Sequence, residues 1–427
     1  MSKNFNIAII GLGYVGLPLA VAFAEKYKVV GFDINLSRVE ELKSGHDSTL
    51  EINDELLNSV LNRNNLNSIG LFVTSDIGHL ASCNIFIVTV PTPTDKYNRP
   101  VLTPLIKATE MIASNLKEGD VVIYESTVYP GVTEEEMVPI LVNKSGLKYN
   151  KDFYCGYSPE RINPGDKEHT VSKILKVTSG STPEIANMVD DLYKSIISAG
   201  TFKATSIKVA EAAKVIENSQ RDINIAFVNE LSKIFNLIGV DTNEVLEAAG
   251  TKWNFLNFKP GLVGGHCIGV DPYYLAQKAQ EVGYHPEIIL AGRRLNDSMG
   301  KYVATEVVRL LLRKSFRINS SKVLLLGFTF KENCPDIRNT RVIDIYNELI
   351  NFDIEVEIFD PIANPVDVLQ EYGIEITNKA PTSKFAAVVL AVSHKEFLDI
   401  DIRAFVNDGI VYDVKGVLSK KIIDARL

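Results

Sequence analysis

The chain has 427 residues, of which 23% are charged and 46% are hydrophobic. That length exceeds what one ordinary hydrophobic core supports, so we expect two or three domains. The net charge of −8 argues against a general nucleic-acid-binding protein, which needs a basic stripe on its surface. An acidic chain can still bind an anionic ligand through a few local lysines or arginines.

The cysteines, the N-terminus and the hydropathy pattern bear on the compartment. Four cysteines lie far apart without a CxxC pair, at Cys83, Cys155, Cys267 and Cys334. This spacing predicts neither a disulfide framework nor a metal site, and it fits a reducing cytoplasm. A strand pattern begins almost at once, which leaves no room for a signal peptide. No apolar run reaches the roughly 18 residues that cross a bilayer, so we expect a cytoplasmic protein with no membrane partner.

The first third of the chain alternates short apolar runs with amphipathic segments. The predicted strands are Ile7–Ile10, Val29–Phe32, Ile85–Val90, Val121–Tyr124, Phe153–Gly156 and Leu175–Thr178. The predicted helices between them include Leu17–Tyr27 and Leu105–Asn115. This alternation predicts an α/β fold with a doubly wound parallel sheet and helices on both faces.

A glycine-rich turn joins the first predicted strand to the first predicted helix. It contains Gly11, Gly13 and Gly16 in GxGxxG spacing, and Asp33 ends the next strand. Gly11 permits the tight turn, Gly13 lets a pyrophosphate reach the backbone, and Gly16 allows the helix and strand to pack closely. The helix N-terminus then faces the phosphates. This context predicts the dinucleotide site of a Rossmann domain.

The residues around the turn indicate which dinucleotide binds. Asp33 is placed to bind the ribose hydroxyls and to repel a 2′-phosphate, which favours NAD over NADP. Arg38 either weakens that preference or lies along the adenine. We assign the rest of the turn, including Tyr14 and Val15, to the cofactor as well.

Further polar residues follow the predicted strands. Thr92 and Thr127 each come just after a strand, where ligands bind in open parallel sheets. Either threonine alone is more often an ordinary turn residue. Glu160 follows Phe153–Gly156 and is either a general base or the partner of Arg161.

Around residue 205 the pattern changes to one long helix, Ser206–Gly239, with apolar residues near 3.6-residue spacing. A helix of that length spans roughly 45 Å, so we expect it to join two domains and to offer a dimer surface. Lys214 and Asn218 are four residues apart and share one face of it. They can hold an oxyanion, or they can belong to a solvated polar stripe. Shorter predicted helices follow at Asn243–Ala249, Pro272–Val282 and Pro286–Leu312.

A loop running from Gly264 to Pro272 places Cys267 ahead of one of these helices. Asp271 can cap the helix, and its positive end favours a thiolate over a thiol. Cys267 is then a candidate nucleophile, and the alternative is a small buried cysteine in a tight turn.

After Ser321 the alternating pattern resumes. The predicted strands are Val323–Phe328, Val356–Phe359, Ala387–Val392 and Ile410–Val414, which indicate a second, smaller α/β domain. It has no GxGxxG, but Lys331 and Arg338 follow its first strand and can bind a phosphate-bearing ligand. We therefore expect an N-terminal Rossmann domain (1–203), a central helical domain with one long helix (204–314) and a C-terminal Rossmann-like domain (315–427).

Taken in order, these motifs resemble the UDP-glucose/GDP-mannose dehydrogenase superfamily over essentially the whole chain. The matching pieces are Gly11–Gly16, Val90–Pro93, Glu125–Thr127, Ser158–Glu160, Glu211–Asn218, Gly264–Asp271 and Gly327–Arg338. Within it, the sequence around Cys267 looks like that of the branch acting on UDP-N-acetylhexosamines. It is similar to that of the Vi-antigen-type UDP-N-acetylglucosamine 6-dehydrogenases of surface-polysaccharide pathways.

The resemblance implies a double oxidation at C6 of a nucleotide sugar, with two NAD⁺ and one water. Cys267 would form a thiohemiacetal and then a thioester, while Lys214 and Asn218 stabilise the oxyanion. Asp271 and Thr127 would position or activate water, and Glu160 would assist thioester hydrolysis.

The resemblance also implies a UDP-binding C-terminal domain, with Lys331 and Arg338 near the nucleotide, and a homodimer through the central helix. Arg161 is a further expected contact to the substrate. One position departs from the UDP-glucose enzymes, which often carry a second glutamate where this chain has Pro164. The division of acid–base roles near the thioester therefore stays open.

Other readings remain. The sugar can be UDP-N-acetylglucosamine, which the resemblance favours, or UDP-N-acetylgalactosamine or UDP-glucose. A one-step hydroxyacid dehydrogenase would need neither a nucleophilic cysteine nor a second α/β domain. A non-catalytic NAD-binding sensor would not need Cys267, Lys214, Asn218 and Asp271 together.

Overall fold

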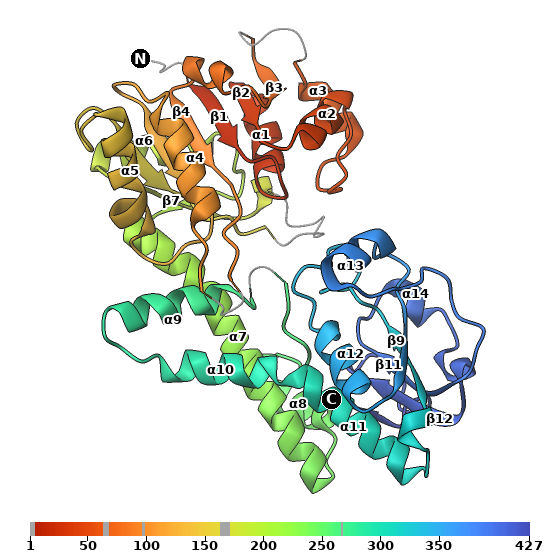
Figure 1. The fold of residues 1–427 in the computed structure, drawn as a ribbon. Coiled ribbons are helices and arrows are strands. Elements are labelled where there is room, and N and C mark those ends of the chain that lie inside the picture. Colours follow the sequence, from red (N-terminus) through yellow and green to blue (C-terminus); the bar gives the residue numbers. More distant parts are fainter. Residues whose placement is uncertain (1–4, 63–67, 96–98, 163–170, 266–267) are drawn as a thin grey trace. The chain divides into compact units, whose positions relative to one another are not determined.

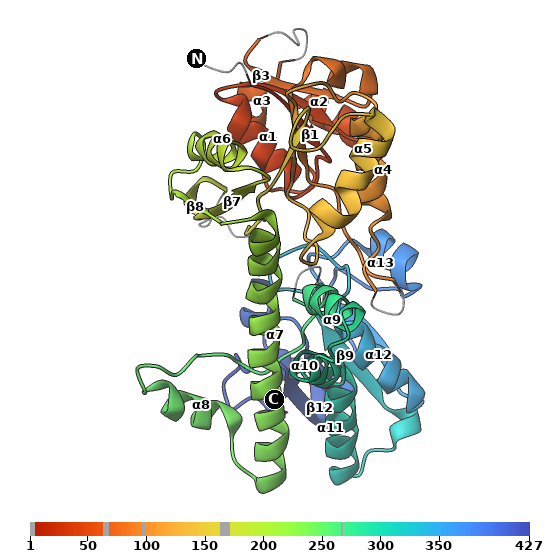
Figure 2. The same ribbon diagram turned by 90° about the vertical axis from the view of Figure 1, so that its left-hand side faces the viewer.

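The computed structural model describes residues 5–62, 68–95, 99–162, 171–265 and 268–427. It divides into two compact units, Met1–Glu217 with Tyr273–Glu281, and Asn218–Pro272 with Val282–Leu427. Figures 1 and 2 show the chain from two directions. Two helices contribute residues to both units, namely α7 (Ile207–Ile238) and α9 (Asp271–Glu281).

The first unit is built on an eight-stranded sheet of order β3-β2-β1-β4-β5-β6-β7-β8. Its strands are β1 (Asn6–Ile10), β2 (Lys28–Phe32), β3 (Gly70–Thr74), β4 (Ile85–Val88), β5 (Val121–Tyr124), β6 (Tyr154–Tyr157), β7 (Lys176–Gly180) and β8 (Thr201–Lys203). Its helices are α1 (Gly16–Ala24), α2 (Leu36–Ser44), α3 (Asp54–Val60), α4 (Thr103–Ala113), α5 (Val138–Ser145) and α6 (Pro183–Lys194). Its shorter turns of helix are η1 (Ile77–Ser82), η2 (Val132–Met137) and η3 (Val171–Lys173).

Alternation along the strands explains why helices cover both faces of this sheet. Ile7 and Ile9 of β1 join one buried cluster with residues of α1, α2, α3 and α6. Ala8 and Ile10 are equally buried but point to the opposite face, because successive side chains of a strand alternate. Figure 2 shows α4 and α5 on the side of the sheet away from α6. The expected doubly wound α/β fold is confirmed.

One pair of strands departs from the expected parallel sheet. β6 and β7 are antiparallel, with Gly156 opposite Gly180 and Tyr157 opposite Ser179. An antiparallel neighbour needs no helical crossover. Among the described residues between these strands, η3 is the one regular element.

The second unit contains a five-stranded parallel sheet of order β10-β9-β11-β12-β13. Its strands are β9 (Lys322–Leu326), β10 (Glu355–Phe359), β11 (Phe385–Leu390), β12 (Val406–Asp413) and β13 (Ala425–Arg426). Its helices are α8 (Thr242–Gly250), α10 (Glu287–Asp297), α11 (Met299–Arg313), α12 (Val342–Asn351), α13 (Pro365–Tyr372) and α14 (Lys395–Leu398), with short turns η4 (Ile318–Ser320) and η5 (Ile402–Phe405).

Both faces of the smaller sheet are again buried. Val323 and Leu325 of β9 pack with α11 and α12 on one face, and Leu324 and Leu326 pack with Phe397 of α14 on the other. This apolar alternation confirms the second α/β domain that the sequence predicts.

Two predictions about helices had different outcomes. The long helix expected over Ser206–Gly239 is α7, which Figure 1 shows as one continuous rod. The single helix expected over Pro286–Leu312 is wrong, because it is two helices, α10 and α11, that meet at Ser298. There the Ser298 hydroxyl donates to the Leu295 carbonyl at 2.7 Å and competes with the helical hydrogen bonds.

Within the described ranges, no helix is long and apolar enough to cross a membrane. The same residues contain no group of three or more His, Cys, Asp or Glu side chains arranged to hold a metal ion.

Candidate active site

The glycine-rich turn after β1 has the form that a dinucleotide needs. A Cβ at Gly16 would lie 1.8 Å from the carbonyl oxygen of Gly11, so only glycine fits there. Gly11 has a φ of +96°, which favours glycine. A Cβ at Gly13 would meet no atom within 4 Å, and Gly13 is exposed. The turn is therefore tight against the sheet at Gly16 and open at Gly13, where a pyrophosphate can approach the start of α1.

Asp33 and Arg38 both hold this turn. Asp33 Oδ2 accepts a hydrogen bond from the backbone N–H of Leu12 at 2.8 Å. Arg38 Nε donates to the carbonyl of Leu12 at 3.0 Å, and its other nitrogens bind Glu41 and Asp47 at 2.7 Å each. Arg38 is buried and each of its three guanidinium nitrogens makes a hydrogen bond, so in this arrangement it braces the turn.

Thr92 and Thr127 lie together beyond β4 and β5. The Thr92 hydroxyl donates to the carbonyl of Thr127 at 2.7 Å, and Tyr274 of α9 donates its hydroxyl hydrogen to the carbonyl of Thr92. Both threonines are half-buried. The structure therefore joins the two strand-end segments that the sequence treats separately.

Glu160 belongs to a buried cluster of charges. One of its oxygens, Oε2, accepts from Lys176 Nζ at 2.8 Å, and Lys176 also binds Glu125 Oε2 at 2.7 Å. Its other oxygen accepts the backbone N–H groups of Arg161 and Ile162 at 2.5 and 2.6 Å. The sequence predicted that Glu160 is either a general base or the partner of Arg161. In the structure the Glu160 carboxylate binds Lys176 and not the Arg161 guanidinium.

The guanidinium of Arg161 points elsewhere. Its Nε donates to Glu217 of α7 at 3.0 Å, and its NH1 donates to the carbonyl of Leu175 at 2.9 Å.

The pKa values of the two carboxylates of this cluster shift in opposite directions. Burial raises the pKa of Glu125 above its usual range, even though Lys176 opposes this. Burial also acts on Glu160, but the Lys176 ammonium and the two backbone N–H groups outweigh it and hold the pKa of Glu160 below its usual range. Lys176 is desolvated as well, yet the two carboxylates raise its pKa. The arrangement therefore favours a charged lysine and an ionised Glu160.

Lys214 and Asn218 both lie in α7. Lys214 is 7% exposed, and its ammonium has no hydrogen bond or ion pair with any residue in the described ranges. Asn218 Nδ2 donates to Oδ2 of Asp271 at 2.6 Å, and Asp271 is buried at the first position of α9. Two residues that the sequence assigned to one site are thus bonded to each other.

A buried glutamate one turn before Lys214 connects α7 to the segment after Thr127. Glu211 accepts the backbone N–H groups of Gly131 and Thr133 at 2.5 and 2.9 Å. It is 0% exposed, and burial raises the pKa of Glu211 to about 7.

The glycines ahead of Cys267 pack against the loop that follows β9. A Cβ at Gly264 would lie 2.5 Å from the carbonyl oxygen of Asn339, which also accepts the N–H of Gly265 at 3.2 Å. The close approach that these glycines permit is therefore made by backbone of this loop. Cys267 itself lies outside the described residues, as does Pro164.

Lys331 and Arg338 both lie in the loop after β9. Arg338 binds Asp336 through Nε at 2.9 Å and NH2 at 2.6 Å, as a two-bond pair. Lys331 is half-buried. It follows Phe330, whose ring lies where a Cβ at Gly265 would be.

A buried histidine fixes this loop. His394 Nδ1 accepts the backbone N–H of Asn333 at 3.0 Å, and Nε2 lies 3.1 Å from both Asp360 Oδ2 and the Thr329 hydroxyl. Because Nδ1 is an acceptor, the proton belongs on Nε2 and the ring is neutral. Asp360 is buried, but its bond from His394 lowers the pKa of Asp360 to about 2.

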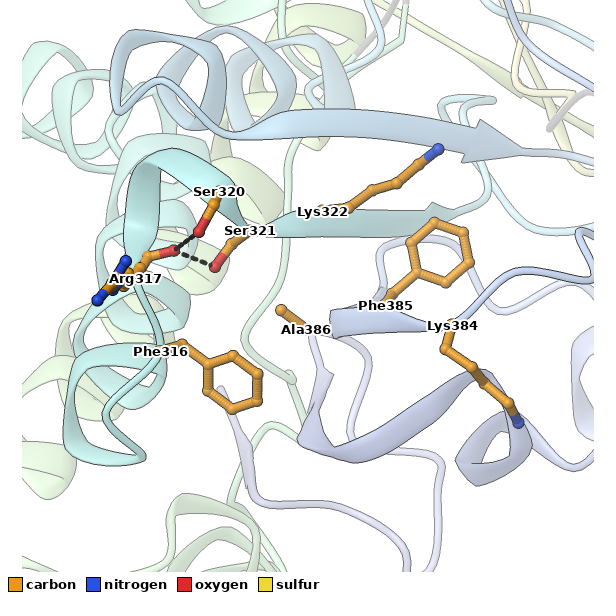
Figure 3. Close-up of a pocket in the computed structure, with 8 residues that line it drawn as sticks. All are labelled: Phe316, Arg317, Ser320, Ser321, Lys322, Lys384, Phe385 and Ala386. Atoms are coloured by element: carbon orange, nitrogen blue, oxygen red, sulfur yellow. Dashed lines mark hydrogen bonds between the residues drawn. The ribbon is translucent and has the colours of Figure 1, made fainter.

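A cavity of about 260 Å³ borders the five-stranded sheet of the second unit (Figure 3). It is lined by Phe316, Arg317, Ser320, Ser321, Lys322, Lys384, Phe385 and Ala386. Lys322 and Phe385 begin β9 and β11, so the cavity is at the amino ends of the strands. Ligands of open parallel sheets bind at the carboxyl ends, and Lys322 is already paired with Glu355 and Glu357. We assign no role to this cavity.

Four residues that contact these side chains or the neighbouring backbone were not predicted from the sequence as site residues, namely Glu125, Lys176, Tyr193 and Glu211. The signal for Lys176 was present, because it is a lysine inside a predicted buried strand, and a buried lysine needs partners. Glu211 gave a weaker signal, since a glutamate beside Ala212 and Ala213 of a helix is not unusual.

Family models match three successive segments of the chain. They describe the UDP-glucose/GDP-mannose dehydrogenase family: its NAD-binding domain over residues 5–197, its central domain over residues 208–298 and its UDP-binding domain over residues 324–420.

Curated relatives and solved structures are similar along the whole chain. The UDP-N-acetyl-D-glucosamine 6-dehydrogenase of Pseudomonas aeruginosa is 57% identical over 429 residues, covering 100% of both chains. The protein of that name from Salmonella typhi is 56% identical, covering 99% of this chain and 98% of its own. The structure of a UDP-D-ManNAc dehydrogenase from Pyrococcus horikoshii has a TM-score of 0.87 and 30% identity, covering 99% of this chain and 98% of its own.

These matches confirm the resemblance, the three-part α/β architecture and the NAD cofactor that the sequence predicts. The chain belongs to the UDP-glucose/GDP-mannose dehydrogenase family, and its N-terminal domain is the family's NAD-binding domain.

Proposed function

We propose that this chain is an NAD-dependent UDP-N-acetylglucosamine 6-dehydrogenase, which oxidises the C6 alcohol of its substrate to a carboxylate. The observation that carries the proposal is the 57% identity, over the full length of both chains, to a relative with that name. The hydrogen bond between Asn218 and Asp271 supports it, because it joins two of the residues to which the chemistry is assigned.

The proposed reaction runs in two oxidations and one hydrolysis. NAD⁺ supplies the hydride acceptor for both oxidations. The thiolate of Cys267 adds to the C6 aldehyde to give a thiohemiacetal, whose oxidation leaves a thioester. Water then adds to the thioester carbonyl, the C–S bond breaks, and the uronic acid and the Cys267 thiol are released.

The remaining residues act on charge and protons. Lys214 and Asn218 stabilise the oxyanion that develops at C6. Asp271 and Thr127 position water, and Glu160 accepts a proton from the water that attacks the thioester. An ionised Glu160 suits this role, because only the carboxylate can act as a base.

The binding contacts are proposals as well. We assign the cofactor to the Gly11–Gly16 turn, Asp33, Arg38, Thr92 and Thr127, with Arg38 acting through the turn that it braces. We assign the nucleotide to Lys331 and Arg338, and for this Arg338 must exchange Asp336 for a phosphate.

Arg161 is proposed as a substrate contact. Its bonds to Glu217 and Leu175 use three of the five N–H groups of a guanidinium, so two remain for a ligand.

The decisive experiment measures NADH formation by the purified protein with UDP-N-acetylglucosamine, UDP-N-acetylgalactosamine and UDP-glucose. We expect two NADH per sugar and the highest kcat/KM for UDP-N-acetylglucosamine. A kcat/KM for UDP-glucose at or above both acetamido sugars would overturn the substrate. One NADH per sugar would indicate a one-step dehydrogenase, and no NADH with any of them would favour a non-catalytic sensor.

Cys267→Ala tests the nucleophile in the same assay. The variant should lose acid formation and keep NAD⁺ binding, whereas turnover like that of the unmodified protein would exclude a covalent role for Cys267.

We further propose a cytoplasmic homodimer that supplies a sugar acid for surface-polysaccharide synthesis, with domains at 1–203, 204–314 and 315–427. Exposed apolar side chains on α7, such as Phe227 (56% exposed) and Leu237 (78% exposed), support a dimer through this helix. Sedimentation of Leu237→Glu beside the unmodified protein tests the dimer, because a charge there should release monomers.

A further inference from the structure

We propose that Lys176 is a positioning residue, which holds Glu160 in place as an ionised base through a buried bridge to Glu125. The inference rests on the proposed function, because it deepens the role assigned there to Glu160. Nothing in the sequence motifs of the chain singled out Lys176.

The bridge is a compact arrangement of three charged groups. Lys176 begins β7, Glu125 follows β5, and Glu160 follows β6. The Lys176 ammonium lies 2.7 Å from Glu125 and 2.8 Å from Glu160. Lys176 and Glu125 are each 2% exposed and Glu160 is 8% exposed, so water screens none of these contacts well.

The two carboxylates are held differently, and the difference points to Glu160 as the working group. Besides Lys176, Glu160 accepts two backbone N–H groups, from Arg161 and Ile162. Glu125 instead accepts the hydroxyl of Tyr193. Backbone donors are fixed in place and stabilise the carboxylate form of Glu160.

Solvent exposure distinguishes the two carboxylates further. The side chain of Glu160 is 10% exposed and that of Glu125 is 0% exposed. Glu160 can therefore exchange a proton with water or substrate, while Glu125 is shielded and serves as the second anchor of the ammonium. An anchor of this kind stops the flexible lysine side chain from turning away.

The ionisable groups that face Glu160 come from β7, from α6 and from the segment after β5. They are Lys176 of β7, Glu125 beyond β5 and Tyr193 of α6, whose ring centroid lies 5.6 Å from the Lys176 ammonium. The Arg161 guanidinium is directed away from them, to Glu217 on α7. Lys176 is the cation that binds the Glu160 carboxylate directly. Its removal should thus disfavour the ionised form of Glu160.

Stability alone gives a poor reason for this cluster. Replacing a buried ion pair by apolar side chains of similar volume is often neutral or stabilising. The two buried charged groups beside the proposed base, Lys176 and Glu125, are better explained by their effect on that base.

The test is the pH dependence of kcat, whose acid limb reports the base in the enzyme–substrate complex. We expect Lys176→Met to lower kcat at neutral pH by about 10²-fold, to leave the KM for UDP-sugar nearly unchanged, and to move the acid limb to higher pH. Lys176→Arg keeps the cation and should restore most of kcat.

Because Lys176→Met leaves two buried carboxylates without a cation, a second comparison removes one of them. Glu125→Gln is measured beside Glu125→Gln/Lys176→Met, which retains only the Glu160 carboxylate. We expect the acid limb of the double variant to lie at higher pH than that of Glu125→Gln. Glu125→Gln by itself should not move the limb to higher pH, because it removes a negative charge from beside Glu160.

Asp190→Asn is the matched control. Asp190 is a buried carboxylate of α6 that binds Thr178 of β7 at 2.7 Å, but it has no bond to Lys176. Its substitution should leave the acid limb in place.

The outcomes separate the inference from the proposed function. An acid limb that is the same in Glu125→Gln and in the double variant, in a protein that still oxidises UDP-N-acetylglucosamine, would overturn the role of Lys176. A limb that rises equally in Glu125→Gln and Lys176→Met would also overturn it, since the cluster would then be purely structural. Absence of oxidation by the unmodified protein would instead overturn the proposed function.

Discussion

Asn218 Nδ2 and Asp271 Oδ2 lie 2.6 Å apart, although the residues are separated by 53 positions. The bond fixes which way the Asn218 amide faces, because only its nitrogen can donate to a carboxylate. It uses one of two N–H groups on that nitrogen and leaves the other for a ligand. Asp271 therefore orients the amide that we assign to the oxyanion.

Asn218→Ala should lower kcat by about 10²- to 10³-fold, because it removes one donor to the developing charge. The loss of kcat should exceed what any fall in melting temperature explains, although buried Asp271 loses one hydrogen-bond donor. Asn224→Ala is a suitable control, because Asn224 lies on the same helix and, among the described residues, its side chain bonds to the Gln220 carbonyl alone, at 2.7 Å. Equal losses of kcat in both variants would contradict a specific role for Asn218.

Lys214→Ala should likewise reduce turnover far more than stability. Lys214 has no ion partner within the described part of the chain, so its removal leaves no described carboxylate unpaired. Lys176→Ala provides the contrast, because it strands two buried carboxylates and should lower the melting temperature clearly. Thermal melts and kcat of both variants decide the matter. A Lys214→Ala protein that is mainly unfolded would support a structural role instead.

Glu211 should make stability fall as pH rises through neutrality. Its pKa in the folded protein is about 7, above the ordinary value of 4.5, so the folded state binds the proton more tightly than the unfolded state. The resulting stabilisation is fully present below about pH 4.5 and is lost as pH rises through about 7. A difference of this size corresponds to about 3 kcal/mol.

Melting temperatures between pH 5 and pH 8 test this. Glu211→Gln should be less stable at pH 5, because an amide accepts only one of the two N–H groups well, but its stability should depend less on pH. Glu230→Gln, at an exposed position of the same helix, should keep the slope of the unmodified protein. An unaltered slope in Glu211→Gln would refute the assignment.

Periodicity predicted the fold well where each element is apolar on one side. The 3.6-residue spacing located α7 to within one residue at each end, and short apolar runs between amphipathic segments indicated both sheets. Strand direction is not encoded in such a pattern, which is why the antiparallel pair β6 and β7 was not foreseen. The apolar periodicity continues across Ser298, so it does not register the break between α10 and α11 there.

The sequence predicted site residues well at positions where only one residue type fits. Gly16 had to be glycine for close packing, and the structure confirms that no Cβ fits there. The partners of Lys176 were not predictable, because they come from strand ends 51 and 16 positions away and are chosen by the sheet order. Arg38 illustrates the same limit, since its role follows from contacts to Asp47 and the Leu12 carbonyl.

The last prediction concerns His394, which ties the loop after β9 to Asp360. His394→Phe removes the acceptor for the Asn333 N–H and the donor to Asp360. The Asp360 carboxylate keeps its hydrogen bonds from the N–H groups of Phe328 and Thr329, but the part-buried N–H of Asn333 loses its acceptor, so the melting temperature should fall. The loop also carries Lys331 and Arg338, so affinity for UDP, measured by calorimetry, should weaken with it. His285→Phe, at an exposed position, should change neither quantity. A lower melting temperature with unchanged UDP affinity would show that His394 supports the fold alone and would count against placing the nucleotide on this loop.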